Sequence, residues 1–169
     1  FSIYFSLAAL FIAVAVGVSI WSFNQVQATS IARAKNALVL DKAHALLSSI
    51  KDAETGQRGY LLTGDEAFLQ PYLAIKNNIT SNLTELHTLT KISTANQHLD
   101  MMAPLIEAKM AELKYLIELR RQNKTALVTS EIRKGKGKIL MDSIRTHMAA
   151  VISIEGDALV KNDAMLQSN

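Results

Sequence analysis

The sequence contains no cysteine, and of its 169 residues only two are proline and seven are glycine. Without cysteine, the chain forms neither a disulfide framework nor a thiolate metal site. Few helix-breaking residues, together with plentiful alanine, leucine, isoleucine, lysine and glutamate, predict helices. No stretch alternates apolar and polar residues for long, so we expect an all-α fold.

The chain also lacks a strong excess of charge of one sign, because 18 Lys and Arg residues are interleaved with 15 Asp and Glu residues. Its one basic cluster, residues 133–138, contains no aromatic residue and belongs to no DNA-reading motif. We therefore expect no nucleic acid among its partners.

Catalytic and metal-binding motifs are missing as well. The histidines form no His-x-x-x-His or Glu-x-x-His pair, and no glycine-rich loop is available to hold a phosphate. We therefore expect no catalytic residues, no metal ion and no cofactor in this chain. The histidines concerned are His44, His87, His98 and His147.

Residues 1–23 contain no charged side chain. An α-helix needs about 20 apolar residues to cross the hydrocarbon core of a bilayer. Tyr4 and Trp21 lie near the two ends of this run, where aromatic rings favour the headgroup region, so we expect them to anchor it. A secretory signal peptide cleaved near residues 26–28 is the alternative, but its apolar core has only about 7–15 residues. The sequence therefore predicts a transmembrane helix at residues 1–23.

Helical periodicity continues after this run, and an apolar stripe extends without a break to about Leu62. Thr63, Gly64 and Asp65 then predict a turn. Gly64 suits a left-handed helix C-terminus, and Asp65 suits the N-cap of the next element. The first helix therefore runs from the membrane to about Leu62.

The remaining residues predict three further helices. A short helical turn at 66–69 precedes a second helix that Pro71 starts, and the polar residues 93–96 separate this helix from the third. Pro104 begins or kinks the third helix, while the last helix tolerates Gly135 and Gly137 or bends at them. The expected bounds are 70–91 for the second helix, 97–123 for the third and 129–169 for the fourth.

These lengths predict a shape, because a helix rises about 1.5 Å per residue. The first and fourth helices are long and the second is about half as long. We expect an elongated antiparallel four-helix bundle that narrows to a two-helix stalk near the membrane. Because the fourth helix returns to membrane level, a second transmembrane helix is expected after Asn169.

Two groups of residues carry a resemblance to a known family. The first group lies at 54–72 and consists of Glu54, Thr55, Gly56, Arg58, Gly59, Tyr60, Leu61, Leu62, Thr63, Gly64, Phe68, Pro71 and Tyr72. The second lies in the expected last helix and consists of Gly137, Met141, Asp142, Ile144, Arg145 and Glu155. Together they resemble the signature of the CHASE3 family, an extracytoplasmic sensory domain of bacterial transmembrane receptors. Residues 160–163 depart from the family pattern.

The resemblance implies that residues 24–169 form a signal-input domain on the periplasmic or extracellular side of the bacterial inner membrane. The output module it implies is most often a histidine kinase of a two-component system. A chemoreceptor, a cyclic-dinucleotide enzyme and a purely structural dimerisation stalk are the alternatives. We expect a parallel homodimer in the lipid bilayer, with an unidentified small molecule or protein as the stimulus.

The first signature group has two interpretations. Glu54 and Arg58 are four residues apart, which is the spacing of a helical ion pair, and Gly56 and Gly59 leave room for a neighbouring helix. In the structural interpretation, the group fastens the first hairpin to the bundle. In the functional interpretation, Arg58 binds the carboxylate or phosphate of a ligand.

Overall fold

The computed structural model describes residues 2–167, apart from the side chains of residues 2, 3, 5–9, 24–26, 28, 29, 163 and 165–167. Every element in this part of the chain is helical, which confirms the predicted all-α class. The elements are α1 (Ser2–Thr63), the 3-10 helix η1 (Glu66–Leu69), α2 (Gln70–Lys76), α3 (Ile79–Leu89), α4 (Ser93–Arg121), α5 (Thr125–Arg133) and α6 (Lys136–Gln167).

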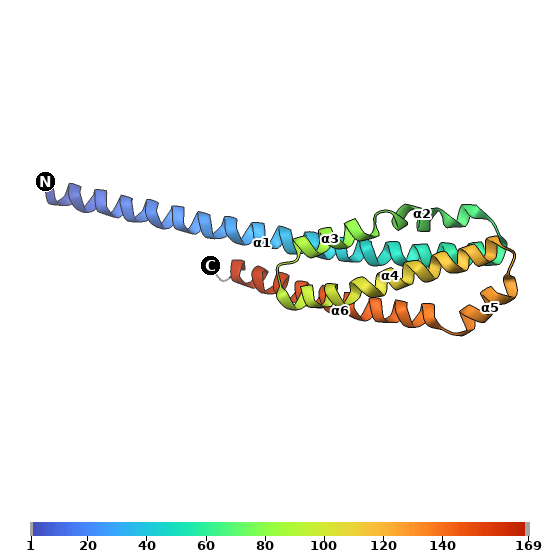
Figure 1. Ribbon diagram of the computed structural model, residues 1–169. Helices are drawn as coiled ribbons and strands as arrows, with labels where there is room; N and C mark the ends of the chain where they lie inside the picture. The colour runs from blue at the N-terminus through green and yellow to red at the C-terminus, as the bar shows by residue number, and fades with distance from the viewer. Residues whose placement is uncertain (1, 168–169) are drawn as a thin grey trace.

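The helices form an elongated rod around α1, which runs through its whole length (Figure 1). Helices α4 and α6 pack against each other and against the C-terminal half of α1, and α2 and α3 follow one another along α1. Both chain ends point the same way, and α5 lies at the opposite end (Figure 1). We call that opposite end, where α1 meets α5, the tip. The described residues form seven helical elements, and the predicted four-helix bundle is not confirmed in that form.

The prediction of one continuous second helix at 70–91 is wrong, because Asn77 and Asn78 separate α2 from α3. The Asn78 side-chain amide donates to the carbonyl of Ala74 at 3.2 Å, and its backbone N–H donates to Ile75 at 2.9 Å. Asparagine side chains compete with the helix for backbone partners in this way. Two adjacent asparagines thus end a helix that has no glycine and whose one proline, Pro71, lies in its first turn.

The predicted start of the third helix is also wrong, since α4 begins at Ser93 and not at residue 97. The residues with extended backbone, Thr90 and Ile92, lie before α4. The backbone N–H of Asn96 donates to the carbonyl of Ile92 at 3.0 Å, which closes the first turn of α4. The polar residues 93–96 therefore start the helix, and Pro104 lies inside it.

The predicted last helix is divided into α5 and α6 at Gly135, which has a φ of 72°. Glycine adopts this left-handed conformation with little steric strain, and the conformation ends the α-helix there. Helix α5 begins at Thr125, earlier than expected, and Val128 packs it against Leu116 and Leu119 of α4. The prediction of one helix that continues past these glycines is therefore wrong, and α5 is a separate element at the tip.

The end of α1 agrees with its prediction. Gly64 has a φ of 77°, and its backbone N–H donates to the carbonyl of Tyr60 at 2.7 Å. The Asp65 carboxylate accepts from the N–H of Ala67 at 2.9 Å and so caps η1. The predicted turn at 63–65 and the helical turn at 66–69 are both confirmed.

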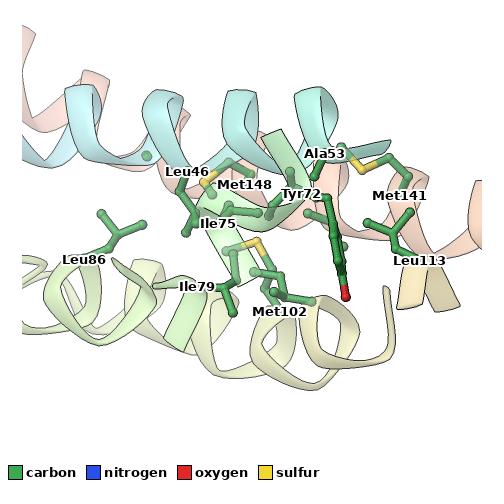
Figure 2. Packing of buried hydrophobic residues seen from close by; sticks show 14 of the residues in the cluster. Leu46, Ala53, Tyr72, Ile75, Ile79, Leu86, Met102, Leu113, Met141 and Met148 are labelled. Carbon is green, nitrogen blue, oxygen red and sulfur yellow. The ribbon is translucent and has the colours of Figure 1, made fainter. Parts of the chain in front are cut away.

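One apolar core holds the helices together (Figure 2). Each of the five helices that surround it contributes buried side chains at helical spacing, and the sulfur atoms of Met102, Met141 and Met148 lie among branched side chains. The residues that Figure 2 labels are Leu46 and Ala53 of α1, Tyr72 and Ile75 of α2, Ile79 and Leu86 of α3, Met102 and Leu113 of α4, and Met141 and Met148 of α6.

The N-terminal part of α1 extends beyond the other helices (Figure 1). Over the part of the chain that the structure describes, no helix has both the length and the hydropathy that a membrane crossing requires. The predicted span at 1–23 lies partly outside the described residues, because the side chains of 1–3 and 5–9 are not described. Tyr4 and Trp21, the expected membrane anchors, are exposed.

At Gly56, the segment after the α1 turn lies close against α1. A Cβ atom at this position would overlap the backbone carbonyl oxygen of Phe68. At Gly59, the added atom would lie 2.5 Å from the Phe68 ring. The room that the sequence predicted at these two glycines is therefore filled by the backbone and side chain of Phe68.

We predict that Gly56→Ala lowers the unfolding free energy by about 1–3 kcal/mol, because a backbone atom has little freedom to move away from the new methyl group. Gly156→Ala is the matched control. Gly156 also lies inside a helix, but nothing is within 4 Å of its added Cβ, so alanine should stabilise by about 0.5–1 kcal/mol. Urea unfolding followed by circular dichroism measures both, and equal shifts in the two variants would contradict the close contact.

Candidate functional site

The most deeply buried charge in the described residues is the ammonium group of Lys109 in α4, whose side chain is 1% exposed. Its Nζ donates to Glu54 Oε1 of α1 at 2.9 Å and to Glu112 Oε2 at 3.0 Å. The carbonyl oxygen of Gly137 in α6 lies 3.4 Å from the same Nζ. One ammonium group thus joins three helices, and we call these four residues the Lys109 network.

Lys109 and Glu54 each stand where an apolar residue would be expected. Lys109 follows Ile106 by three residues and precedes Leu113 by four, so it lies on the buried face of α4. Glu54 follows Ile50 by four residues on the buried face of α1. Helical periodicity therefore turns the two opposite charges toward each other inside the core.

Gly137, from the second signature group, is adapted to this network. A Cβ atom there would lie 2.7 Å from Glu112 Oε1 and 3.0 Å from its Cδ. Glycine thus allows the Glu112 carboxylate to approach the α6 backbone and reach Lys109.

Arg58 lies at the edge of the network rather than inside it. Its Nη2 donates to Glu54 Oε1 at 3.4 Å, and its side chain is 65% exposed. The ion pair predicted from the four-residue spacing is present but long. The buried partner of Glu54 is Lys109, a residue 55 positions away that the sequence analysis missed.

A cavity of about 540 Å³ opens beside the network, between α1, α4, α5 and the start of α6. Its wall combines network residues with apolar side chains, among them Leu61, Leu116 and Val128. Two buried nitrogen atoms of its lining residues, Gln57 Nε2 and Arg120 Nε, have no hydrogen-bond partner in the described part of the chain. Neither residue was predicted from the sequence.

An exposed ion pair between Arg121 and Glu66 lies at the tip, next to the rest of the first signature group. Arg121 of α4 binds both carboxylate oxygens of Glu66, at 2.9 and 2.7 Å, and also reaches Glu118 at 3.0 Å. The hydrogen bonds from Arg121 lower the pKa of Glu66, whereas burial raises the pKa of nearby Tyr60.

The remaining residues of the first signature group differ in their exposure. Tyr60 and Tyr72 are buried, Leu61 and Pro71 half-buried, and Thr55, Leu62, Thr63, Gly64 and Phe68 exposed.

The second signature group divides between the core and the surface of α6. Met141 and Ile144 are core residues, whereas Asp142 accepts from Lys138 at 2.6 Å and from Arg145 at 3.2 Å on the exposed side. The hydrogen bond from Lys138 lowers the pKa of Asp142. Glu155 is buried, and its Oε1 has no partner among the described residues, so burial raises its pKa.

The histidines lie on four different helices, but the fold brings two of them together. Nδ1 of His98 in α4 lies 3.0 Å from Nδ1 of His147 in α6. Among the residues that the structure describes, no three metal-binding side chains form a group that could hold an ion. The pair is therefore a hydrogen bond between two helices.

We predict that Lys109→Met lowers the unfolding free energy by about 3–5 kcal/mol, because it leaves the buried Glu54 and the partly buried Glu112 without their partner. Lys114→Met, an exposed position on the same helix, should change stability little. The double variant Glu54→Gln/Lys109→Met should recover part of the loss, since one stranded charge is removed. Chemical unfolding of all three measures this, and similar midpoints for Lys109→Met and Lys114→Met would refute the role of the network.

We predict a pH-dependent effect of Glu155→Gln. Because the pKa of Glu155 is raised above its ordinary value of 4.5, the folded chain binds this proton more tightly than the unfolded chain. The contribution of Glu155 to stability is thus largest at low pH and falls as pH rises from 4.5 through the folded pKa. The variant should therefore gain melting temperature relative to the wild type as pH increases over this window. Glu107→Gln, which is exposed, should show no such trend, and a constant difference for Glu155→Gln would contradict the burial argument.

Comparisons with known proteins give two findings. The chain matches the sequence model of the CHASE3 domain over residues 30–165. In structure, it resembles the sensor domain of the Rhodopseudomonas palustris histidine kinase HK9, with a TM-score of 0.63 and 24% sequence identity, over 74% of this chain and 98% of that chain. No curated protein matches the sequence. The solved structure supports the helical fold, and the match to the family covers both signature groups.

Proposed function

Because this chain belongs to the CHASE3 domain family, we propose that it is the extracytoplasmic signal-input domain of a bacterial transmembrane receptor. The receptor's output module is a histidine kinase of a two-component system, in keeping with the similarity to a histidine kinase sensor domain. Catalysis belongs to that output module, and this domain supplies the regulation.

The continuity of α1 is the observation that carries this proposal. The helix has 62 residues without a break, which corresponds to about 93 Å at 1.5 Å per residue. It contributes Glu54 to the Lys109 network near its C-terminus and extends past all the other helices at its N-terminus (Figure 1). Packed helices shift by about 1–2 Å between alternative arrangements, so a change near the tip is passed along α1 as a displacement.

The exposed N-terminal part of α1 supports a membrane anchor at residues 1–23. This segment has no charged residue, and every described side chain in it is exposed. Tyr4 and Trp21 then lie at the two headgroup regions of the bacterial inner membrane. In this arrangement α6 returns toward the membrane beside α1, and a second transmembrane helix follows Asn169. Helices α2 and α3 together serve as the second helix of an antiparallel four-helix bundle.

Pairing of two chains accounts for the exposed apolar residues of α1 between the membrane segment and the core. Ile31 and Leu38 are 67% and 43% exposed and lie seven residues apart. A seven-residue apolar repeat is the pattern with which parallel helices pair. A parallel homodimer joined along residues 27–38 would bury this stripe and place two input domains over one kinase dimer.

We predict that single cysteines scanned through residues 27–50 of the full-length receptor crosslink between subunits with a period near 3.5 residues. Ile31→Cys and Leu38→Cys should crosslink most readily, and Ser81→Cys, exposed on α3, should not. Crosslinks at different positions should fix the receptor at different autophosphorylation rates, because each one favours a different arrangement of α1.

Aperiodic crosslinking would refute the parallel dimer. Periodic crosslinking with the same autophosphorylation rate at every position would show that the domain is a structural stalk and not a signal input.

A further inference from the structure

The cavity beside the Lys109 network has the size and lining of a small-molecule site. Its volume of about 540 Å³ lies within the roughly 300–1,000 Å³ that is typical of ligand pockets. Leu61, Leu116 and Val128 give it an apolar wall at the junction of α1, α4 and α5. It also lies partly open, because Thr125 and Thr129 on its wall are exposed.

Two buried donors indicate the chemistry of the ligand. Gln57 is only 3% exposed, yet its Nε2 donates to no acceptor in the described residues, and the same holds for the buried Nε of Arg120. Burying a donor without a partner costs roughly 1–3 kcal/mol, so native proteins rarely leave one unpaired. Both nitrogen atoms carry N–H and accept nothing, so the group that satisfies them is a hydrogen-bond acceptor.

The position of Arg120 makes a negatively charged acceptor the best fit. Its Nη2 would lie 3.2 Å from a Cβ at Gly64, so its guanidinium reaches the C-terminus of α1, where helix carbonyl groups favour a cation. No ion pair joins Arg120 to an acidic side chain of the described residues. The fold thus keeps a charged donor beside the cavity and leaves its Nε unpaired.

The charges around the cavity limit the ligand to a small anion of low charge. The ionisable residues of its wall are Glu54, Arg58, Lys109, Glu112, Arg120 and Lys138. Lys138 is bound to Asp142 outside the wall, so three cations face two carboxylates and leave one positive charge. A polyphosphate would meet too little positive charge, and a cation would face Arg120.

We propose that this cavity binds a small organic acid with an apolar body, as the stimulus of the input function proposed above. Because Gln57 Nε2 and Arg120 Nε are both buried, these two side chains turn toward the cavity on binding, so that the carboxylate accepts hydrogen bonds from both. The hydrocarbon body lies against Leu61, Leu116 and Val128. The ligand would thereby touch α1, α4 and α5 together, close to the network that joins α1 to α6. It would alter signalling to the extent that it binds two helix arrangements with different affinity.

Binding of hexanoate to the full chain in phospholipid nanodiscs tests this proposal, with the signal of empty nanodiscs subtracted. The comparison ligands are acetate, 1-hexanol and hexylammonium, which lack the apolar body, the charge or the correct sign of charge. We expect calorimetry to show hexanoate binding at least about tenfold more tightly than each of the three, which corresponds to about 1.4 kcal/mol. Equal binding of hexanol and hexanoate, or no saturable hexanoate binding, would overturn the proposal.

Variants of the wall locate the site. Arg120→Gln should weaken hexanoate binding by roughly tenfold, or about 1.4 kcal/mol, whereas Arg133→Gln, an exposed arginine outside the cavity, should leave it unchanged. Thr129→Trp places a large side chain from an exposed wall position into the cavity and should abolish binding. Circular dichroism of this variant should match that of the wild type, as expected for a folded chain. Unchanged binding in both wall variants would exclude this cavity.

These measurements need no kinase output, and the cysteine scan needs no ligand. If hexanoate does not bind but the cysteine scan gives the expected crosslinks and autophosphorylation rates, the organic-acid site is wrong and the signal-input function stands.

Discussion

The structure depends on the burial of one ammonium group. Removing Lys109 from water costs several kcal/mol, and only close carboxylates with good geometry offset this. Glu54 and Glu112 meet that requirement from α1 and α4, and the carbonyl of Gly137 adds a contact from α6. An apolar interface tolerates sliding by a turn, whereas an ammonium group between fixed oxygen atoms does not. The Lys109 network therefore sets the register of three helices.

This register explains the arrangement of the tip. With Glu112 held against Gly137, α6 begins close to α4, and the left-handed Gly135 turns the preceding chain away to form α5. Helix α5 then contacts α4 through Val128 and leaves the cavity between itself and α1. The cavity and the network are thus two results of the same packing. A group bound in one lies close enough to affect the other.

The features that the sequence could predict are those encoded locally. The end of α1 follows from Gly64 and Asp65, which act through their own backbone and nearest neighbours. The break at Asn77 and Asn78 was missed because asparagine also occurs inside helices. Here the Asn78 side chain donates to the carbonyl of Ala74, and this contact accompanies the end of α2.

The candidate site was predicted only in part, because its central contact joins residues that are far apart in the sequence. The four-residue rule found Arg58 as a partner of Glu54, but no local rule reaches Lys109, 55 residues away. A signal for it was present, since a lysine interrupts the apolar stripe of α4 between Ile106 and Leu113. Polar residues on buried helix faces, including Gln57 and Glu155, mark positions where tertiary contacts must be sought.

The unbroken α1 helix also acts as a lever. If α1 pivots near the tip, each degree of tilt moves its other end sideways by about 1.6 Å over a length of about 93 Å. Such a movement equals the helix shifts that separate alternative packing arrangements. Rearrangements too small to disturb the core around Leu46 and Met148 would thus become large enough at the N-terminal end to change which residues of two neighbouring helices face each other.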